Sequence, residues 1–156
     1  MKEATRRVMD ALEAAGIETR VVEFAERTRT AEEAAAAVGT TVGRIVKSLV
    51  FVAGDEPVLA LVSGANRLDT ERLAADLGRP IRRAKADEVR EATGFAIGGV
   101  PPLGHARRLA VYVDRDLTGY DVVYAAAGTP NSVFPIAPTD LVRVTGGAVL
   151  DLAARE

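Results

Sequence analysis

The fold is decided by the stretch RIVKSLVFV, residues 44–52, because from Lys47 to Val52 it reads as a strand rich in Val, Leu and Phe. Side chains alternate between the two faces of a strand, so Lys47 shares a face with Leu49 and Phe51. An ammonium group on an apolar face is costly to desolvate unless an anion or a ligand offsets that cost. The alternative is that Lys47 only opens the strand and extends its charged end to water. Lys47 is therefore a candidate functional residue.

Length and composition favour one globular domain, residues 1–156, which would bury roughly 68–70% of its extended surface. Hydrophobic residues make up 48% and charged residues 27%, which are ordinary values for a soluble protein. Cysteine is absent, which excludes disulfides and thiolate metal sites and fits a cytoplasmic location. The amino terminus lacks the apolar core of a signal peptide, and no apolar run is long enough to span a bilayer, so we expect no membrane association.

The charge balance limits the kind of nucleic acid contact that this chain can make. A formal net charge of −2 argues against a protein that coats nucleic acid through bulk electrostatics. Basic residues cluster locally around residues 6–7, 79–85 and 105–108, and such clusters are commonly solvated surface. Any nucleic acid partner would therefore be contacted by this protein over only a short segment of its length.

Capping and turn residues divide the chain into helices and strands. Thr30 and Glu33 are spaced as a capping box and Gly39 supplies a stop, which predicts a helix over 31–38. Further helices are expected at 2–15, 70–77, 87–93 and from 138, with a helical turn at 42–46. Strands are expected at 17–24, 47–52, 58–62, near 81, and at 109–113, 122–127 and 132–136, and an apolar tail follows Gly147. Because the strands are too irregularly spaced for repeated βαβ units, the pattern predicts an α+β fold in which 47–52 and 58–62 form a hairpin.

Several familiar chemistries are missing from the sequence. It contains no P-loop, no dinucleotide-binding fingerprint and no nucleophile elbow. His105 is the only histidine, which disfavours a histidine triad or a multi-histidine metal site, and we place it at the rim of any site. We expect no metal and no cofactor. The chemistry is then left to Lys47, to hydroxyl groups and to backbone groups in glycine-rich loops.

Two glycine-rich loops are candidates for that role. Residues 98–104, GGVPPLG, cannot be regular structure and could present backbone N–H groups to an anionic or tetrahedral centre. Residues 128–131, GTPN, follow the small residues 125–127, which either leave room for a ligand or permit close packing. Each loop can equally be a structural turn.

Taken in order, five motifs resemble a known family. They are TRTAEEAA at 28–35, IVKSLVF at 45–51, SGANRLD at 63–69, GFAIGGVPPLG at 94–104 and AGTPN at 127–131. This order closely resembles the YbaK family, also called the prolyl-tRNA synthetase-associated or editing domain family, from about residue 5 to residue 150. The resemblance implies a compact α+β domain with a mixed, barrel-like β-sheet flanked by helices. It also implies hydrolysis of wrongly charged aminoacyl-tRNA.

The resemblance carries catalytic roles to two places in the chain. The strand lysine that the family requires for activity matches Lys47, which would position the terminal adenosine of the tRNA. The family's glycine loop matches residues 98–102, where main-chain groups of Gly98 and Gly99 would hold the aminoacyl ester and a water. Pro102 in the same loop is a substrate-binding candidate.

The resemblance also implies substrate-binding residues outside that loop. Gly128 and Asn131 lie where the family closes the amino-acid pocket. Some relatives place a histidine in this second loop, whereas this chain has TPNS at 129–132, so the amino-acid preference stays open. Thr30 and Asn66, from the first and third motifs, complete the set.

These features together predict an enzyme of translation quality control. A synthetase pocket rejects a competitor that differs by one methylene by only about 1–3 kcal/mol, so small amino acids need a second sieve. An aminoacyl ester is already activated and needs mainly positioning and oxyanion support, which a chain with one histidine can supply. We expect a deacylase that acts in trans on tRNA mischarged with Ala, Ser or Cys, holds the 3′-terminal CCA and has a synthetase as a second candidate partner. The alternatives are a non-catalytic module that binds aminoacyl-tRNA or an aminoacyl-adenylate and docks on a synthetase, and an enzyme for a different acyl ester.

Overall fold

The computed structural model describes residues 1–26, 28 and 30–155, so Arg29 of the first motif lies outside the described residues. The helices are α1 (Glu3–Ala14), α2 (Ala31–Val38), α3 (Thr70–Leu77), α4 (Ala86–Thr93) and α5 (Pro138–Thr145), with 3₁₀ helices η1 (Val42–Arg44) and η2 (Arg115–Gly119). The strands are β1 (Val22–Glu23), β2 (Val46–Ala53), β3 (Glu56–Ser63), β4 (Ile81–Arg83), β5 (Ala110–Asp114), β6 (Val123–Ala126), β7 (Ser132–Ile136) and β8 (Ala148–Leu150). The α+β class expected from the sequence is confirmed.

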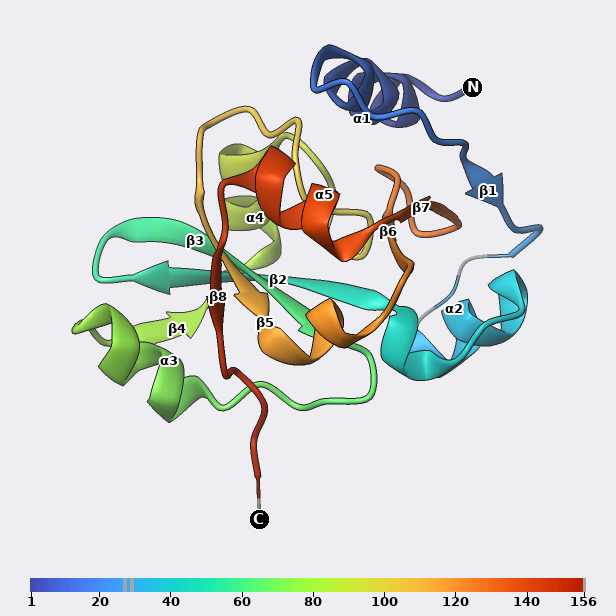
Figure 1. Ribbon diagram of the computed structural model, residues 1–156. Helices are drawn as coiled ribbons and strands as arrows, with labels where there is room; N and C mark the ends of the chain where they lie inside the picture. The colour runs from blue at the N-terminus through green and yellow to red at the C-terminus, as the bar shows by residue number, and fades with distance from the viewer. Residues whose placement is uncertain (27, 29, 156) are drawn as a thin grey trace.

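The strands lie in two sheets (Figure 1). The larger has the order β4-β2-β3-β5-β8, in which β2 runs antiparallel to β3 and β4 while the β3–β5 and β5–β8 pairs are parallel. The smaller, β1-β7-β6, is antiparallel and touches the larger through a parallel bridge between Ile45 and Tyr124. The sheet is therefore mixed, as expected, but the described strands do not close into a barrel, because β4 and β8 are left as edges of the larger sheet.

The predicted hairpin forms the centre of the larger sheet and is buried on both faces. Lys47 lies opposite Val62 and Phe51 opposite Val58 in the β2–β3 register. Val46, Val50 and Val52 of β2 pack into a core with residues of α1, α4 and α5, whereas Phe51 and Ala53 pack with α3 on the other face. Figure 1 shows the same division, with α4 and α5 on one side of the sheet and α3 on the other. Burial on two faces explains why this part of the sequence is an almost continuous apolar run.

Caps fix the ends of the helices where the sequence predicts them. The Thr30 hydroxyl accepts the Glu33 N–H at 3.1 Å at the start of α2, and Gly39 ends the helix with φ +83°. At α3, the Asp69 carboxylate accepts the Arg72 N–H at 3.0 Å. None of the described helices has the length and the apolar character that crossing a bilayer requires.

One expected strand is much shorter than predicted, and one strand of the structure was not predicted. The expected strand at 17–24 is reduced to Val22–Glu23, because these two residues are the part of that segment that pairs with β7. The expected apolar tail after Gly147 contains β8, in which Val149 pairs with Val113 of β5. The strand that pairs with β8 lies far away in the sequence, so the residues around β8 do not predict a strand by themselves.

Candidate active site

A cavity of about 380 Å³ opens where the two sheets meet. It is lined by residues from the start of α2, the first half of β2, the 97–100 loop, and the loop between β6 and β7. These segments lie far apart in sequence and carry four of the five motifs that pointed to a common function.

The cavity exists because the edge of β2 is only partly covered. β4 pairs with residues 51–53 of β2, and the Ala84 N–H extends this contact by donating to the Val50 carbonyl at 3.1 Å. Residues 46–49 of β2 continue beyond β4 and line the cavity instead. The short length of β4 thus leaves the stretch around Lys47 accessible to a ligand.

Lys47 lies in this uncovered part of the strand, and its ammonium group is held in place. Nζ donates a hydrogen bond to the main-chain carbonyl of Asn66, which follows β3. Partial burial lowers the pKa of the Lys47 ammonium, and the carboxylates of Glu32 and Asp114 oppose that shift. A lysine that only extended into solvent would have neither the carbonyl partner nor the lowered pKa.

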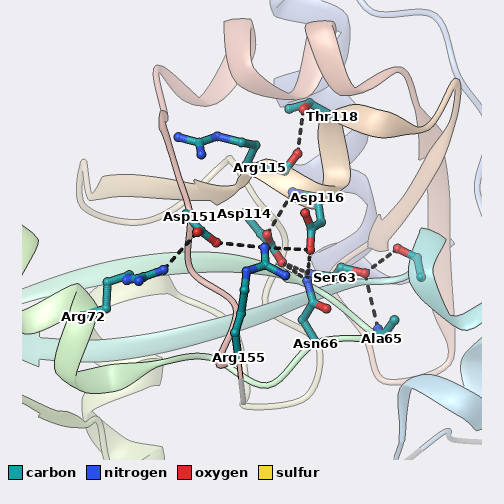
Figure 2. A network of polar contacts seen from close by, with 11 residues as sticks. Ser63, Ala65, Asn66, Arg72, Asp114, Arg115, Asp116, Thr118, Asp151 and Arg155 are labelled. Atoms are coloured by element: carbon teal, nitrogen blue, oxygen red, sulfur yellow. Dashed lines mark hydrogen bonds and ion pairs between the residues drawn. The ribbon is translucent and has the colours of Figure 1, made fainter.

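Asn66 contributes to the site through its backbone, while its side chain points elsewhere. Its amide Nδ2 donates to Asp114 Oδ2 and to Asp116 Oδ2, both at 2.8 Å (Figure 2). The side chain therefore faces two carboxylates, and Asn66 is not among the residues that line the cavity.

The 98–104 loop lies beside the cavity with one glycine exposed to it. Gly98 lines the cavity with φ +91°, a conformation that favours glycine. Gly99 is buried against the second loop, where an added Cβ would lie 2.9 Å from the Gly128 carbonyl oxygen, and its N–H donates to the Ala96 carbonyl at 3.0 Å. Pro102 is buried and does not line the cavity. Of the three predicted residues in this loop, the structure brings Gly98 to the cavity.

The second loop divides between residues that face the cavity and residues that brace the loop. Thr129, Pro130 and Ser132 line the cavity, and Thr30 joins them from the start of α2. Asn131 instead fixes the loop in place through hydrogen bonds of its side chain.

The bracing contacts of the second loop are specific. Asn131 Nδ2 donates to the Phe24 carbonyl at 3.0 Å, and Asn131 Oδ1 accepts from the Thr129 hydroxyl at 2.9 Å. Gly128 packs against α1, because a Cβ there would lie 2.8 Å from the Ala4 carbonyl oxygen. Among the residues predicted for this loop and for α2, the structure places Thr30 at the cavity, and Gly128 and Asn131 behind it.

His105 supports the glycine loop from outside. Its Nε2 lies 2.7 Å from the Pro101 carbonyl oxygen, and because a carbonyl oxygen only accepts, the ring donates its Nε2–H to the main chain. Burial lowers the pKa of His105, and the bond to Pro101 opposes part of that shift. The neutral imidazole therefore holds the 98–104 loop in place through its hydrogen bond to the Pro101 carbonyl.

Sequence reasoning missed several lining residues, among them Ser48, Arg83, Ile97 and Tyr124. Ser48 Oγ is buried, and the structure gives it no hydrogen-bond partner. Ile97 is a 51% exposed apolar side chain next to Gly98, and its position in the fourth motif was the available signal. In the part of the chain that the structure describes, no three His, Asp or Glu side chains gather closely enough to hold a metal ion.

Fold and cavity agree with one protein class. The sequence model described as an aminoacyl-tRNA editing domain matches residues 25–144, so the chain belongs to the aminoacyl-tRNA editing domain family. This confirms the family recognised from the motifs and the expected enzyme class, an aminoacyl-tRNA hydrolase.

Individual relatives agree with that assignment. The uncharacterized protein YwhH of Bacillus subtilis is 36% identical over 125 residues, which cover 80% of each chain. A protein of Enterococcus faecalis named "Putative Cys-tRNA(Pro)/Cys-tRNA(Cys) deacylase EbsC" is 27% identical over 81% of this chain and 78% of its own length. A crystal structure described as "a putative trans-editing enzyme for prolyl tRNA synthetase" superposes with a TM-score of 0.95 at 51% identity, covering 99% of both chains.

Proposed function

We propose that the protein removes a small amino acid of the Ala, Ser or Cys class from mischarged tRNA, acting in trans. The observation that carries the proposal is the cavity itself, where the anchored Lys47 ammonium and the backbone of Gly98 meet across a space that is part polar and part apolar. Within the class we favour Cys and a proline tRNA, because one relative is named as a deacylase of Cys-tRNA and a solved neighbour is described as acting for prolyl-tRNA synthetase.

The proposed reaction is simple hydrolysis. Water adds to the ester carbonyl, the bond between that carbon and the ribose oxygen breaks, and the products are the free amino acid and a tRNA with a restored hydroxyl. The Lys47 ammonium would hold the negatively charged 3′ end, since one of its protons is committed to the Asn66 carbonyl and the others remain available. Main-chain groups at Gly98 would face the ester, where close approach of backbone is possible because no side chain intervenes.

The proposed partner is the single-stranded acceptor end of the tRNA, the proposed recruiter is a synthetase and the proposed location is the cytoplasm. A cavity of about 380 Å³ is within the size range of small-molecule sites and suits one terminal nucleoside with a small aminoacyl group better than a duplex. The alternative function is a module that binds the same end without turnover.

A panel of proline tRNAs charged separately with Cys, Ala, Ser and Pro tests the function. Each charged tRNA is supplied at a concentration well below saturation of the enzyme. Release of labelled amino acid is compared with spontaneous hydrolysis of the same tRNA without protein. We expect release of Cys, Ala or Ser and none above background for Pro. If no ester is hydrolysed but charged tRNA still binds, the binding module is the correct function.

A further inference from the structure

The end of β5 carries a carboxylate that the proposed reaction does not use. Asp114 is 0% exposed, and its two oxygens accept three hydrogen bonds. Oδ2 accepts from the Ser63 N–H at 3.0 Å and from Asn66 Nδ2 at 2.8 Å, and Oδ1 accepts from the Asp116 N–H at 3.0 Å (Figure 2). Burying a carboxylate is unfavourable unless such donors replace water, so this arrangement is built around Asp114.

Asn66 connects Asp114 to the cavity. Its side-chain amide is fixed between the carboxylates of Asp114 and Asp116, while its carbonyl oxygen accepts the hydrogen bond from Lys47. The same residue therefore has one end in the carboxylate network and the other end on the ammonium group. The side-chain contacts therefore add to the main-chain bond from the Asn66 N–H to the Ser63 carbonyl, 2.9 Å long, in holding the direction of the Asn66 carbonyl.

The network continues away from the cavity to the C-terminal segment. Asp116 Oδ2 lies 3.6 Å from Arg155 Nη2, and Arg155 and Arg72 both contact Asp151 (Figure 2). Among the described residues, Asp151 contacts Arg72 and Arg155 but neither Asn66 nor Lys47, so it belongs to the same network without touching the link to the cavity.

We propose that Asp114, acting through Asn66, is a positioning residue that fixes where the Lys47 ammonium lies in the cavity. The proposal rests on the proposed function only in assuming that hydrolysis needs Lys47. Among the described residues, the charged groups that act on Lys47 or line the cavity with it are Glu32 on α2, Asp114 at the end of β5 and Arg83 of β4, with Asp116 of η2 reached through Asn66. Asp114 thus contributes both direction, through Asn66, and negative charge.

Two substitutions separate direction from charge. Asn66→Ala removes the amide but keeps the main-chain carbonyl at position 66, while Asp114→Asn removes the charge. Asp151→Asn is the matched control, because it removes a carboxylate from the same network while both direct partners of the Asn66 amide, Asp114 and Asp116, stay in place. We expect kcat/KM for the mischarged tRNA to fall about tenfold or more in Asn66→Ala and Asp114→Asn, since small displacements of a positioned group are costly, and to stay within about twofold in Asp151→Asn.

A double-mutant cycle shows whether the effect passes through Lys47. If it does, Lys47→Ala combined with Asn66→Ala is no less active than Lys47→Ala alone, measured under single-turnover conditions with excess enzyme. A multiplicative further loss would overturn the proposal, because it would mean that Asn66 acts independently of the lysine. Asn66→Ala keeps this test available should Asp114→Asn fail to fold.

A second measurement does not depend on deacylase activity, so its outcome tests this proposal independently of the proposed function. The pKa of the Lys47 ammonium is followed by NMR of the labelled lysine side chains, with Lys47→Ala used for assignment. Loss of the Asp114 charge should lower that pKa relative to the wild type, and Asp151→Asn should leave it unchanged. An unchanged Lys47 pKa in folded Asp114→Asn would overturn the proposal, even if the wild type hydrolyses every ester in the panel.

Discussion

At the scale of single residues, Lys47 combines a charge with a fixed position. It occupies a strand whose neighbours are apolar, and its hydrogen bond to a main-chain carbonyl limits where the ammonium group can go. Burial lowers its pKa while nearby carboxylates oppose the shift, and the side chain is partly shielded from water. There a positive charge acts more strongly on a bound anion than it would in water.

We expect Lys47→Ala to lower kcat/KM for a mischarged tRNA by about 10²-fold or more, as removal of a preorganised electrostatic contact does. Lys47→Arg should fail as well, because a planar guanidinium does not reproduce a compact ammonium. The check is deacylation kinetics together with thermal unfolding, which should show a folded protein. Lys85→Ala, at an exposed lysine that does not line the cavity, is the control and should keep wild-type kinetics.

His105 leads to a prediction about stability against pH. Burial holds its pKa below the ordinary 6.5, so the folded protein resists protonation more than the unfolded chain does. The free energy of unfolding should therefore be highest above about pH 6.5 and should fall as the pH is lowered from about 7 to about 5.5.

Chemical denaturation of wild type and His105→Gln over this pH range measures the effect. In the glutamine variant the part of the pH dependence due to His105 should disappear, while the amide can still donate to the Pro101 carbonyl. Equal pH dependence in both proteins would show that His105 does not titrate differently on folding.

At the scale of elements, the two glycine loops depend on each other. Gly99 lies so close to Gly128 and Thr129 that a single methyl group would push the loops apart. We expect Gly99→Ala to lower the free energy of unfolding by about 1–3 kcal/mol, the usual cost of overpacking, and to reduce deacylation. Both are measured by denaturant titration and by the tRNA assay.

Gly119→Ala provides the matched comparison for that substitution. An added Cβ at Gly119 would meet no atom within 4 Å, so stability should change by no more than about 0.5 kcal/mol. Similar losses in both variants would mean that loop contact is not what Gly99 provides.

Local signals explain which elements the sequence predicts. Thr30 with Gly39, and Asp69 with Gly78, define α2 and α3 because caps and stops are determined within a few residues. β8 was missed because its stability comes from pairing with β5, which local sequence does not reveal.

The site was predicted less completely than the elements. Lys47, Gly98 and Thr30 line the cavity, and their catalytic and binding roles stay predictions that rest on the order of the motifs. The sequence could not show that the Asn66 side chain turns toward Asp114, or that Asn131 binds the Phe24 carbonyl, because each contact joins segments that meet only in the folded chain.

At the scale of the whole molecule, the net charge of −2 limits contact with the body of a tRNA. A grip on the acceptor end alone involves a few phosphates, so log affinity should fall against log salt with a slope of only about 2–4. An acceptor-stem minihelix with the same amino acid should be deacylated within about tenfold of the full tRNA, a difference under roughly 1.4 kcal/mol. Kinetics on both substrates side by side provide the test, and an inert minihelix would indicate contacts outside the acceptor end.

The pairing of β1 with β7 has a consequence for how the protein is made. Val22 pairs with Val133, and the cavity is lined from Thr28 to Val133, so neither can form until residue 133 has left the ribosome. Segments early in the chain can complete their pairing only after later segments have been made, which is typical of proteins with many contacts between distant residues. A nascent chain of this editing enzyme therefore has no complete cavity, and cannot act on mischarged tRNA, until the segment around residue 133 has been made.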